Sequence, residues 1–160
     1  MRILVAIDAS PAGSEALNLA GELLTGRDAT ITILHVIPRQ NVRTKYGAMT
    51  IECLDIEAER AAADQLLEHA MQRLRSAGLG PRIVTQLEIG DPSSTILAAI
   101  EDTRSDLLLL GYSGLSRAQR FLLGSVSTRV VTHASCSVIV AHPKPGTVGD
   151  THGTTEYAEA

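Results

Sequence analysis

Short continuous apolar runs alternate along this chain with longer stretches of helical spacing. The first run, Ile3 to Ile7, has no polar face and ends at Asp8, which is typical of a parallel strand buried on both faces. The Asp8 to Pro11 stretch has the chemistry of a turn that leads into a helix. Four later runs predict further strands at 30–37, 82–89, 106–110 and 137–141.

Helical spacing of apolar residues fills the intervals between these strands. It predicts helices from Ala12 to a stop signal at Gly26, and over 51–77, 92–103 and 124–134. Residues 38–50 show no period, and we interpret them as a loop long enough to cover a site. Pro38 is expected to end the second strand, because proline cannot donate to a ladder.

Strands that alternate with helices indicate an α/β fold. We expect a doubly wound, five-stranded parallel sheet in the order 3-2-1-4-5, with helices on both faces. In that order the first and fourth strands are neighbours at the switch point, where ligands bind outside the carboxyl ends of the strands. This arrangement places Asp8 beside Gly111.

Composition narrows the possible partners. The chain has 160 residues, of which 44% are hydrophobic, and its 14 basic and 18 acidic side chains give a formal net charge of −4. A chain of this length can form one domain with a full hydrophobic core that needs no disulfide bond or structural metal. An acidic balance without basic runs argues against duplex nucleic acid and anionic membranes. An aromatic content of 2% argues against stacking platforms for single strands.

The sequence predicts neither a targeting segment nor a cysteine-based site. The apolar run at 3–7 is too short for a secretory signal or a membrane span. Cys53 and Cys136 lie far apart and fit no zinc spacing, so we interpret them as reduced thiols of a cytoplasmic protein. Histidines are scattered without a helical metal-pair spacing, and we expect no protein metal site. His35 is interpreted as an interior strand histidine.

The segment 111–128 is rich in glycine and hydroxyl residues. Gly111 and Gly114 follow a buried strand, and Gly124 precedes Ser125 and Ser127 at a helix start. Glycine allows close backbone approach and positive φ, and free N–H groups at a helix N-terminus attract anions, so a polyphosphate suits this surface. A Gly-Ser cap also occurs in α/β proteins without any ligand, and this alternative stays open.

Other phosphate and nucleophile motifs do not match. The chain contains no GxxxxGK[ST] sequence, and its first strand is followed by Asp-Ala-Ser-Pro rather than GxGxxG. The segment 111–115 fails the GxSxG pattern at its fifth residue. The clustered acids and the lysine of receiver domains are missing, as are the motifs of adenylyl-transferring enzymes.

The spacing Gly111-x2-Gly114-x9-Gly124-Ser125 resembles the ATP-binding signature of the universal stress protein family. The resemblance extends to Val5-Ala6-Ile7-Asp8, to Leu34-His35-Val36-Ile37 and to 124–131. It covers 1–142 as one nucleotide-binding domain. Residues 143–160 have no apolar period, and we expect a disordered tail there.

The resemblance implies a set of binding residues. It places Ala6, Ile7 and Asp8 around the adenosine, and it gives Val36 backbone pairing with adenine. It puts Leu110 beside the base or ribose, and it surrounds the ribose and phosphates with Gly111, Gly114, Gly124, Ser125, Val126 and Ser127. Two simpler interpretations stay open: Asp8 as a carboxylate at a helix N-terminus and Val36 as a core strand residue.

Two segments depart from the family pattern. Family members often have Gly-Ser-His-Gly or Gly-Ser-Arg-Gly where this chain has Gly-Tyr-Ser-Gly at 111–114, so a phosphate-facing hydroxyl and a basic group are displaced or missing. Cys136-Ser137-Val138 stands where the family commonly has Cys-Pro-Val. A serine there leaves the last strand free to pair at its edge.

The resemblance implies an ATP-binding regulatory module of the stress response that forms a homodimer through the last strand. A divalent cation such as Mg²⁺ can accompany the triphosphate, held mainly by phosphate oxygens and water. We assign no catalytic residue, because no general base for water is evident in the glycine-rich segment. The alternative is a slow ATPase or an adenylyl-transferring enzyme.

Overall fold

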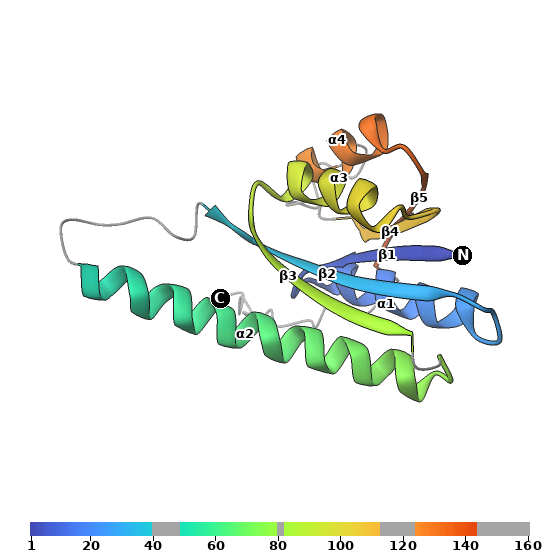
Figure 1. Cartoon of the computed structure of the whole chain (residues 1–160), viewed down its shortest axis with the longest axis horizontal. Coiled ribbons are helices and arrows are strands. Elements are labelled where there is room, and N and C mark those ends of the chain that lie inside the picture. Colours follow the sequence, from blue (N-terminus) through green and yellow to red (C-terminus); the bar gives the residue numbers. More distant parts are fainter. Residues whose placement is uncertain (40–48, 80–81, 113–123, 144–160) are drawn as a thin grey trace, which may run out of the picture.

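A computed structural model describes residues 1–39, 49–79, 82–112 and 124–143, with side chains from 56 onward in the second range. Five strands form one parallel sheet, in the order β3-β2-β1-β4-β5 (Figure 1). The strands are β1 (Arg2–Ile7), β2 (Thr30–Pro38), β3 (Ile83–Gly90), β4 (Leu107–Gly111) and β5 (Ser137–Ala141). The helices between them are α1 (Pro11–Leu24), α2 (Met49–Ser76), α3 (Pro92–Thr103) and α4 (Ser125–His133). The predicted fold class and strand order are confirmed.

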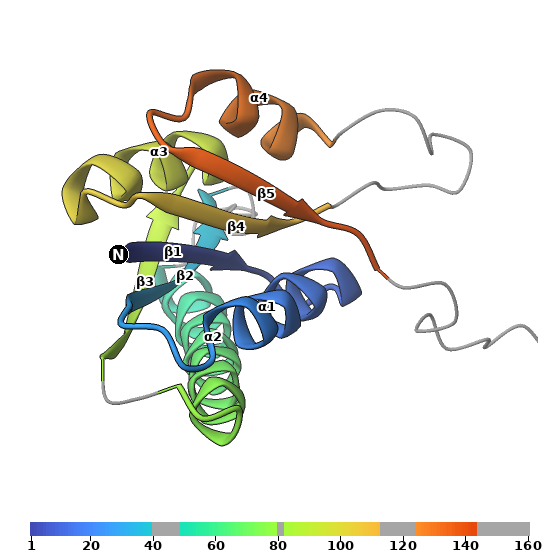
Figure 2. The ribbon, with the colours of Figure 1, turned by 90° about the vertical axis from the view of Figure 1, so that its right-hand side faces the viewer.

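Helices cover the two faces of the sheet in pairs. α1 and α2 pack on one face, and α3 and α4 pack on the other (Figures 1 and 2). Side chains of β1 alternate between the two layers, so Ile3 and Val5 join the core under α1 and α2, while Leu4 joins the core under α3 and α4. The unbroken apolar run of β1 is explained by this burial on both faces.

Some predicted boundaries are wrong by one or two residues. β2 includes Pro38, which pairs in register with Gly90 at the last position of the strand. A proline is tolerated at a strand end because little ladder lies beyond it. α2 begins at Met49, so the predicted loop is shorter at both ends, and its residues 40–48 lie outside the described part of the chain.

Two helices begin with the same local device, a side-chain cap followed by proline. Ser10 caps α1 by accepting a hydrogen bond from the Gly13 N–H at 3.1 Å, and Asp91 caps α3 by accepting one from the Ser94 N–H at 3.0 Å. Proline follows each cap at the first helical position, where no N–H is needed.

Gly13 and Gly111 allow the end of β4 to pack against the first turn of α1. A Cβ atom on Gly111 would lie 2.4 Å from the carbonyl carbon of Ala12, and one on Gly13 would lie 2.5 Å from the carbonyl oxygen of Asp8. Positive φ occurs at only two described glycines, Gly26 and Gly78. Gly111 is therefore not required for a positive φ. Glycine is required there because any side chain would collide with the backbone of α1.

The two glycines of α1 provide a matched pair for this interpretation. We expect Gly13→Ala to lower the free energy of unfolding by about 1–3 kcal/mol, because its methyl group has no space. Gly21→Ala should raise it by about 0.5–1 kcal/mol, because its Cβ would lie 3.5 Å from that of Ala77, an ordinary contact, and alanine is a better helix former. Urea denaturation of both variants measures the difference, and equal midpoints would contradict the interpretation.

Candidate functional site

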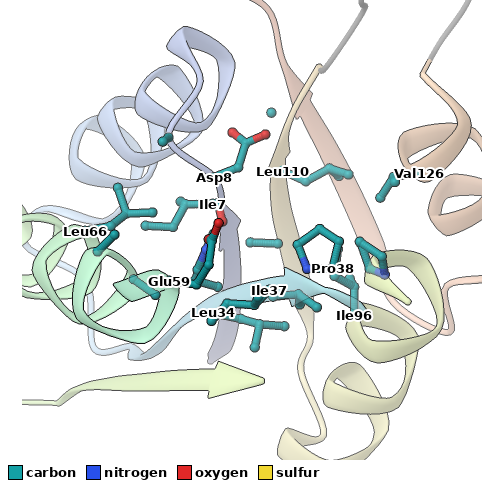
Figure 3. A pocket seen from close by; sticks show the side chains of 18 of the residues that line it. Ile7, Asp8, Leu34, Ile37, Pro38, Glu59, Leu66, Ile96, Leu110 and Val126 are labelled. Atoms are coloured by element: carbon teal, nitrogen blue, oxygen red, sulfur yellow. The ribbon is translucent and has the colours of Figure 1, made fainter. Parts of the chain in front are cut away.

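A pocket of about 480 Å³ opens at the carboxyl ends of β1, β2 and β4, at the predicted switch point (Figure 3). The strands supply its floor, and α2, α3 and α4 supply its walls. Its lining consists of residues 6–9, 34–38, 59, 62, 63, 66, 92, 96, 110, 111, 126 and 127. Most of these side chains are apolar, as is usual for a pocket that takes a flat organic ring.

Strand β2 runs past the end of β1 inside this pocket. The pairing of β1 with β2 ends at Ile7 and His35, whereas the pairing of β2 with β3 continues to Pro38 and Gly90. Residues 36–38 therefore keep a neighbour on one edge and extend beyond β1 on the other, and all three line the pocket. The extension places strand backbone at the pocket wall.

The start of α4 lies at the same end of the sheet. Gly124 is its N-cap with φ −55°, so it does not use the positive φ that glycine allows, and among the described residues no side chain caps this helix. Ser127 is only 1% exposed, and its hydroxyl donates a long hydrogen bond of 3.4 Å to the Gly111 carbonyl. A buried hydroxyl and the uncapped first turn of a helix thus stand beside the pocket.

Asp8 follows β1 and has both of the roles that the sequence left open for it, one at a helix N-terminus and one at the candidate site. Its Oδ1 atom accepts hydrogen bonds from the Ser10 N–H at 3.1 Å and from the Ser10 hydroxyl at 2.5 Å, and so orients the cap of α1. The carboxylate also lines the pocket and lies near Leu110 (Figure 3). It is a helix N-terminal carboxylate and a pocket residue at once.

The structure brings most of the predicted site residues together. Those that line the pocket are Ala6, Ile7, Asp8, Val36, Leu110, Gly111, Val126 and Ser127. Gly124 and Ser125 lie at the start of α4, next to the lining residues but not among them. Gly114 lies outside the described residues.

One wall of the pocket was not predicted from the sequence. Glu59, Ala62, Ala63 and Leu66 line it from α2, at a spacing of one helix face. Pro92 and Ile96 line it from α3. The helical spacing of these residues was visible, but nothing in the sequence said that the middle of α2 lies beside the switch point.

His35 has the interior role expected for it and also lines the pocket. Its Nδ1 atom lies 2.9 Å from the Ile7 carbonyl oxygen. Because a carbonyl only accepts, Nδ1 carries the proton in this hydrogen bond. The ring therefore ties the end of β1 to β2. Cys136 is half-buried beside the core, and burial raises the pKa of its thiol, as in an unreactive cysteine.

An ion pair joins α3 to α4 beside the pocket. Asp91 Oδ1 accepts hydrogen bonds from the Ser94 hydroxyl at 2.7 Å, the Ser94 N–H at 3.0 Å and the Ser93 hydroxyl at 2.9 Å. Arg129 Nη1 lies 3.4 Å from the same oxygen. The Ser94 hydroxyl is the largest cause of a pKa of about 2 at Asp91, and Arg129 is a minor one, so the carboxyl group is ionised at neutral pH.

Within the described residues, no group of three or more His, Cys, Asp or Glu side chains could hold a metal ion. The same residues contain no helix that is both long and apolar enough to cross a membrane.

Comparison with known proteins identifies the family. The model of the universal stress protein family matches residues 1–142. A protein from Staphylococcus saprophyticus that carries the family's name is 32% identical over 139 residues, covering 86% of this chain and 81% of the relative. One from Staphylococcus aureus is 34% identical over the same length and coverage.

Solved structures with the same fold include several universal stress proteins. The universal stress protein UspA from Lactobacillus plantarum superimposes with a TM-score of 0.73 at 28% identity, covering 88% of this chain and 97% of that one. An Arabidopsis thaliana family protein with AMP bound gives a TM-score of 0.68 at 23% identity, covering 91% and 93%. A universal stress protein in complex with cAMP gives 0.67 at 23% identity, covering 89% and 97%. On the family match and these relatives, the chain belongs to the universal stress protein family.

Proposed function

We propose that the switch-point pocket binds an adenine nucleotide, ATP among them, and that the protein acts as a cytoplasmic regulatory module of the stress response. The observation that carries this proposal is the extension of β2 beyond β1 inside an apolar pocket. Two relatives of the same fold, named for bound AMP and bound cAMP, support an adenine nucleotide as the ligand class.

The base recognition that we propose uses backbone rather than side chains. Adenine presents an amino donor next to a ring-nitrogen acceptor, and a strand edge presents a carbonyl next to an N–H. Pro38 has no N–H, so the donor to the base comes from Val36 or Ile37. Guanine carries the opposite pattern at the same edge, with an oxygen acceptor and a ring N–H donor, and it would leave groups unpaired.

The ribose and phosphates would lie between β4 and the start of α4. In this arrangement Ala6, Ile7, Asp8 and Leu110 surround the adenosine, and the phosphates lie near Gly111, Gly114, Gly124, Ser125, Val126 and Ser127. The uncapped first turn of α4 and the Ser127 hydroxyl support this direction, because both offer donors to an anion. A Mg²⁺ ion would be held through the phosphates and water.

A regulatory role fits these residues better than catalysis. Asp8 is a carboxylate at the switch point, and its Oδ1 atom is committed to Ser10 and the α1 cap. The Nδ1 proton of His35 is committed to the Ile7 carbonyl. Neither group is arranged to orient a water molecule for attack on a phosphate, so any ATP hydrolysis should be slow.

The first test compares two nucleotides on the unmodified protein. We expect calorimetric titration to give an affinity for ATP at least tenfold higher than for GTP, because guanine leaves buried backbone groups unpaired, at a cost of about 1–3 kcal/mol. Adenosine should also bind, more weakly than ATP. Equal affinities for the two nucleotides, or no heat and no thermal shift with either, would refute the adenine assignment.

The second test removes one hydroxyl group. We expect Ser127→Ala to weaken ATP binding about tenfold or more, since a hydrogen bond to a charged group contributes about 1.5–3 kcal/mol. Ser105→Ala is the matched control, because Ser105 is also buried but bonds to Thr103 away from the pocket. If both variants bind ATP like the parent protein, the phosphates do not lie at α4.

We further propose a homodimer through β5. This strand pairs with β4 on one side and forms the edge of the sheet, and its residues 138–140 are half-buried. An apolar edge without a protecting charge invites pairing with a second chain, and a two-fold axis there makes the contact self-complementary.

The dimer is tested by placing a charge on this edge. We expect the parent protein to have the mass of a dimer in light scattering at tens of micromolar, and Ile139→Lys to have that of a monomer. Val131→Lys, at a 42% exposed position of α4, should leave the mass unchanged. Urea midpoints show whether each variant is folded. A folded Ile139→Lys variant that stays dimeric would place the interface elsewhere.

A further inference from the structure

The charges that line the pocket do not suit a polyphosphate. Asp8 and Glu59 are its acidic lining residues, and no lysine or arginine is among the described residues that line it. Two carboxylates repel a phosphate chain across a pocket of this size. A cation beside the lining would offset this repulsion for a nucleotide with several phosphates.

Arg129 lies where such a cation is needed. It follows Val126 by three residues on α4, so the two side chains project from the same side of the helix. Val126 lines the pocket, and the partner of Arg129, Asp91, immediately precedes Pro92, which also lines it. The guanidinium group thus stands at the rim, between α4 and the start of α3.

The contact that holds Arg129 there is weak and easily exchanged. Asp91 already receives three shorter hydrogen bonds from Ser93 and Ser94, and Arg129 adds a fourth at 3.4 Å. The two side chains of the ion pair are 55% and 57% exposed. Exposed ion pairs of this kind add little stability, whereas a guanidinium group binds phosphate oxygens through two parallel hydrogen bonds.

We propose that Arg129 determines the preference for the phosphate chain, by leaving Asp91 and binding the phosphates of the nucleotide. Asp91 competes with the phosphates for the guanidinium group, and it stays in place as the cap of α3 after Arg129 has left. The inference rests on the proposed nucleotide site. It adds to that site the residue that makes it bind a nucleotide more tightly than a nucleoside.

The experiment measures ATP and adenosine affinities by calorimetry for the parent protein and for Arg129→Gln. We expect ATP affinity to fall about tenfold or more, and adenosine affinity to stay within a factor of two. Arg129→Lys should fall in between, because it keeps the charge and loses the two-pronged geometry. Arg82→Gln is the matched control, since Arg82 forms an exposed ion pair with Asp28 at the opposite end of the sheet.

A double-mutant cycle tests the competition with Asp91. Asp91→Asn keeps an acceptor for the helix cap and removes the charge, so it should raise ATP affinity severalfold. The same substitution should have little effect when Arg129 is already glutamine, whereas a general charge effect would persist there and would overturn the proposed exchange. Asp28→Asn is the control for a surface carboxylate lost elsewhere.

Three results would overturn the inference while leaving the proposed function intact. They are unchanged ATP affinity in Arg129→Gln, an equal loss for ATP and adenosine, and a loss confined to Arg39→Gln, at the arginine that follows β2. A parent protein that binds neither ATP nor adenosine refutes the proposed function itself, and the inference with it. Urea midpoints confirm that each variant is folded before its affinity is compared.

Discussion

The close packing of Gly111 against the first turn of α1 holds the switch point together. A Cβ on Gly111 would lie within 2.6 Å of three backbone atoms of Ala12 and Gly13, so the two segments approach as near as bare backbone allows. This contact fixes the start of α1 against the end of β4, next to the Asp8–Ser10 hydrogen bonds. A glycine that a binding signature assigns to the ligand is thus first a packing requirement, and a larger residue there would disturb the fold and the pocket together.

Helix capping distinguishes the helix N-termini at this edge of the sheet. In α1 and α3 a side chain, Ser10 or Asp91, already accepts from the first turn, and a proline removes one further donor. α4 has glycine at its cap, and none of the side chains that the structure describes caps its first turn. An anion gains more from a first turn whose N–H groups lack such an acceptor. The capping pattern, more than any charged side chain in the lining, favours phosphates at α4.

The order of strands and helices could be predicted from the sequence because each element carries its own period. β1 and β4 are apolar on both faces, which permits only a parallel strand between two layers, and the switch point follows from the strand order. Boundaries were less predictable, as at Pro38, which ends β2 but is itself the last residue of that strand. The wall formed by Glu59 and Leu66 depends on how the middle of α2 is placed against the sheet, and no local pattern encodes that placement.

The same packing connects the proposed nucleotide site to the proposed dimer edge. Val130 of α4 belongs to the core under α3 and α4, and Val126, at the pocket, packs against that core, as do Val138 and Val140 of β5. Three residues separate the end of α4 from the start of β5. Because a close-packed core transmits small displacements rather than absorbing them, a ligand that displaced the first turn of α4 would shift the residues against which β5 packs. The proposed nucleotide site and the proposed dimer edge thus share one packed layer.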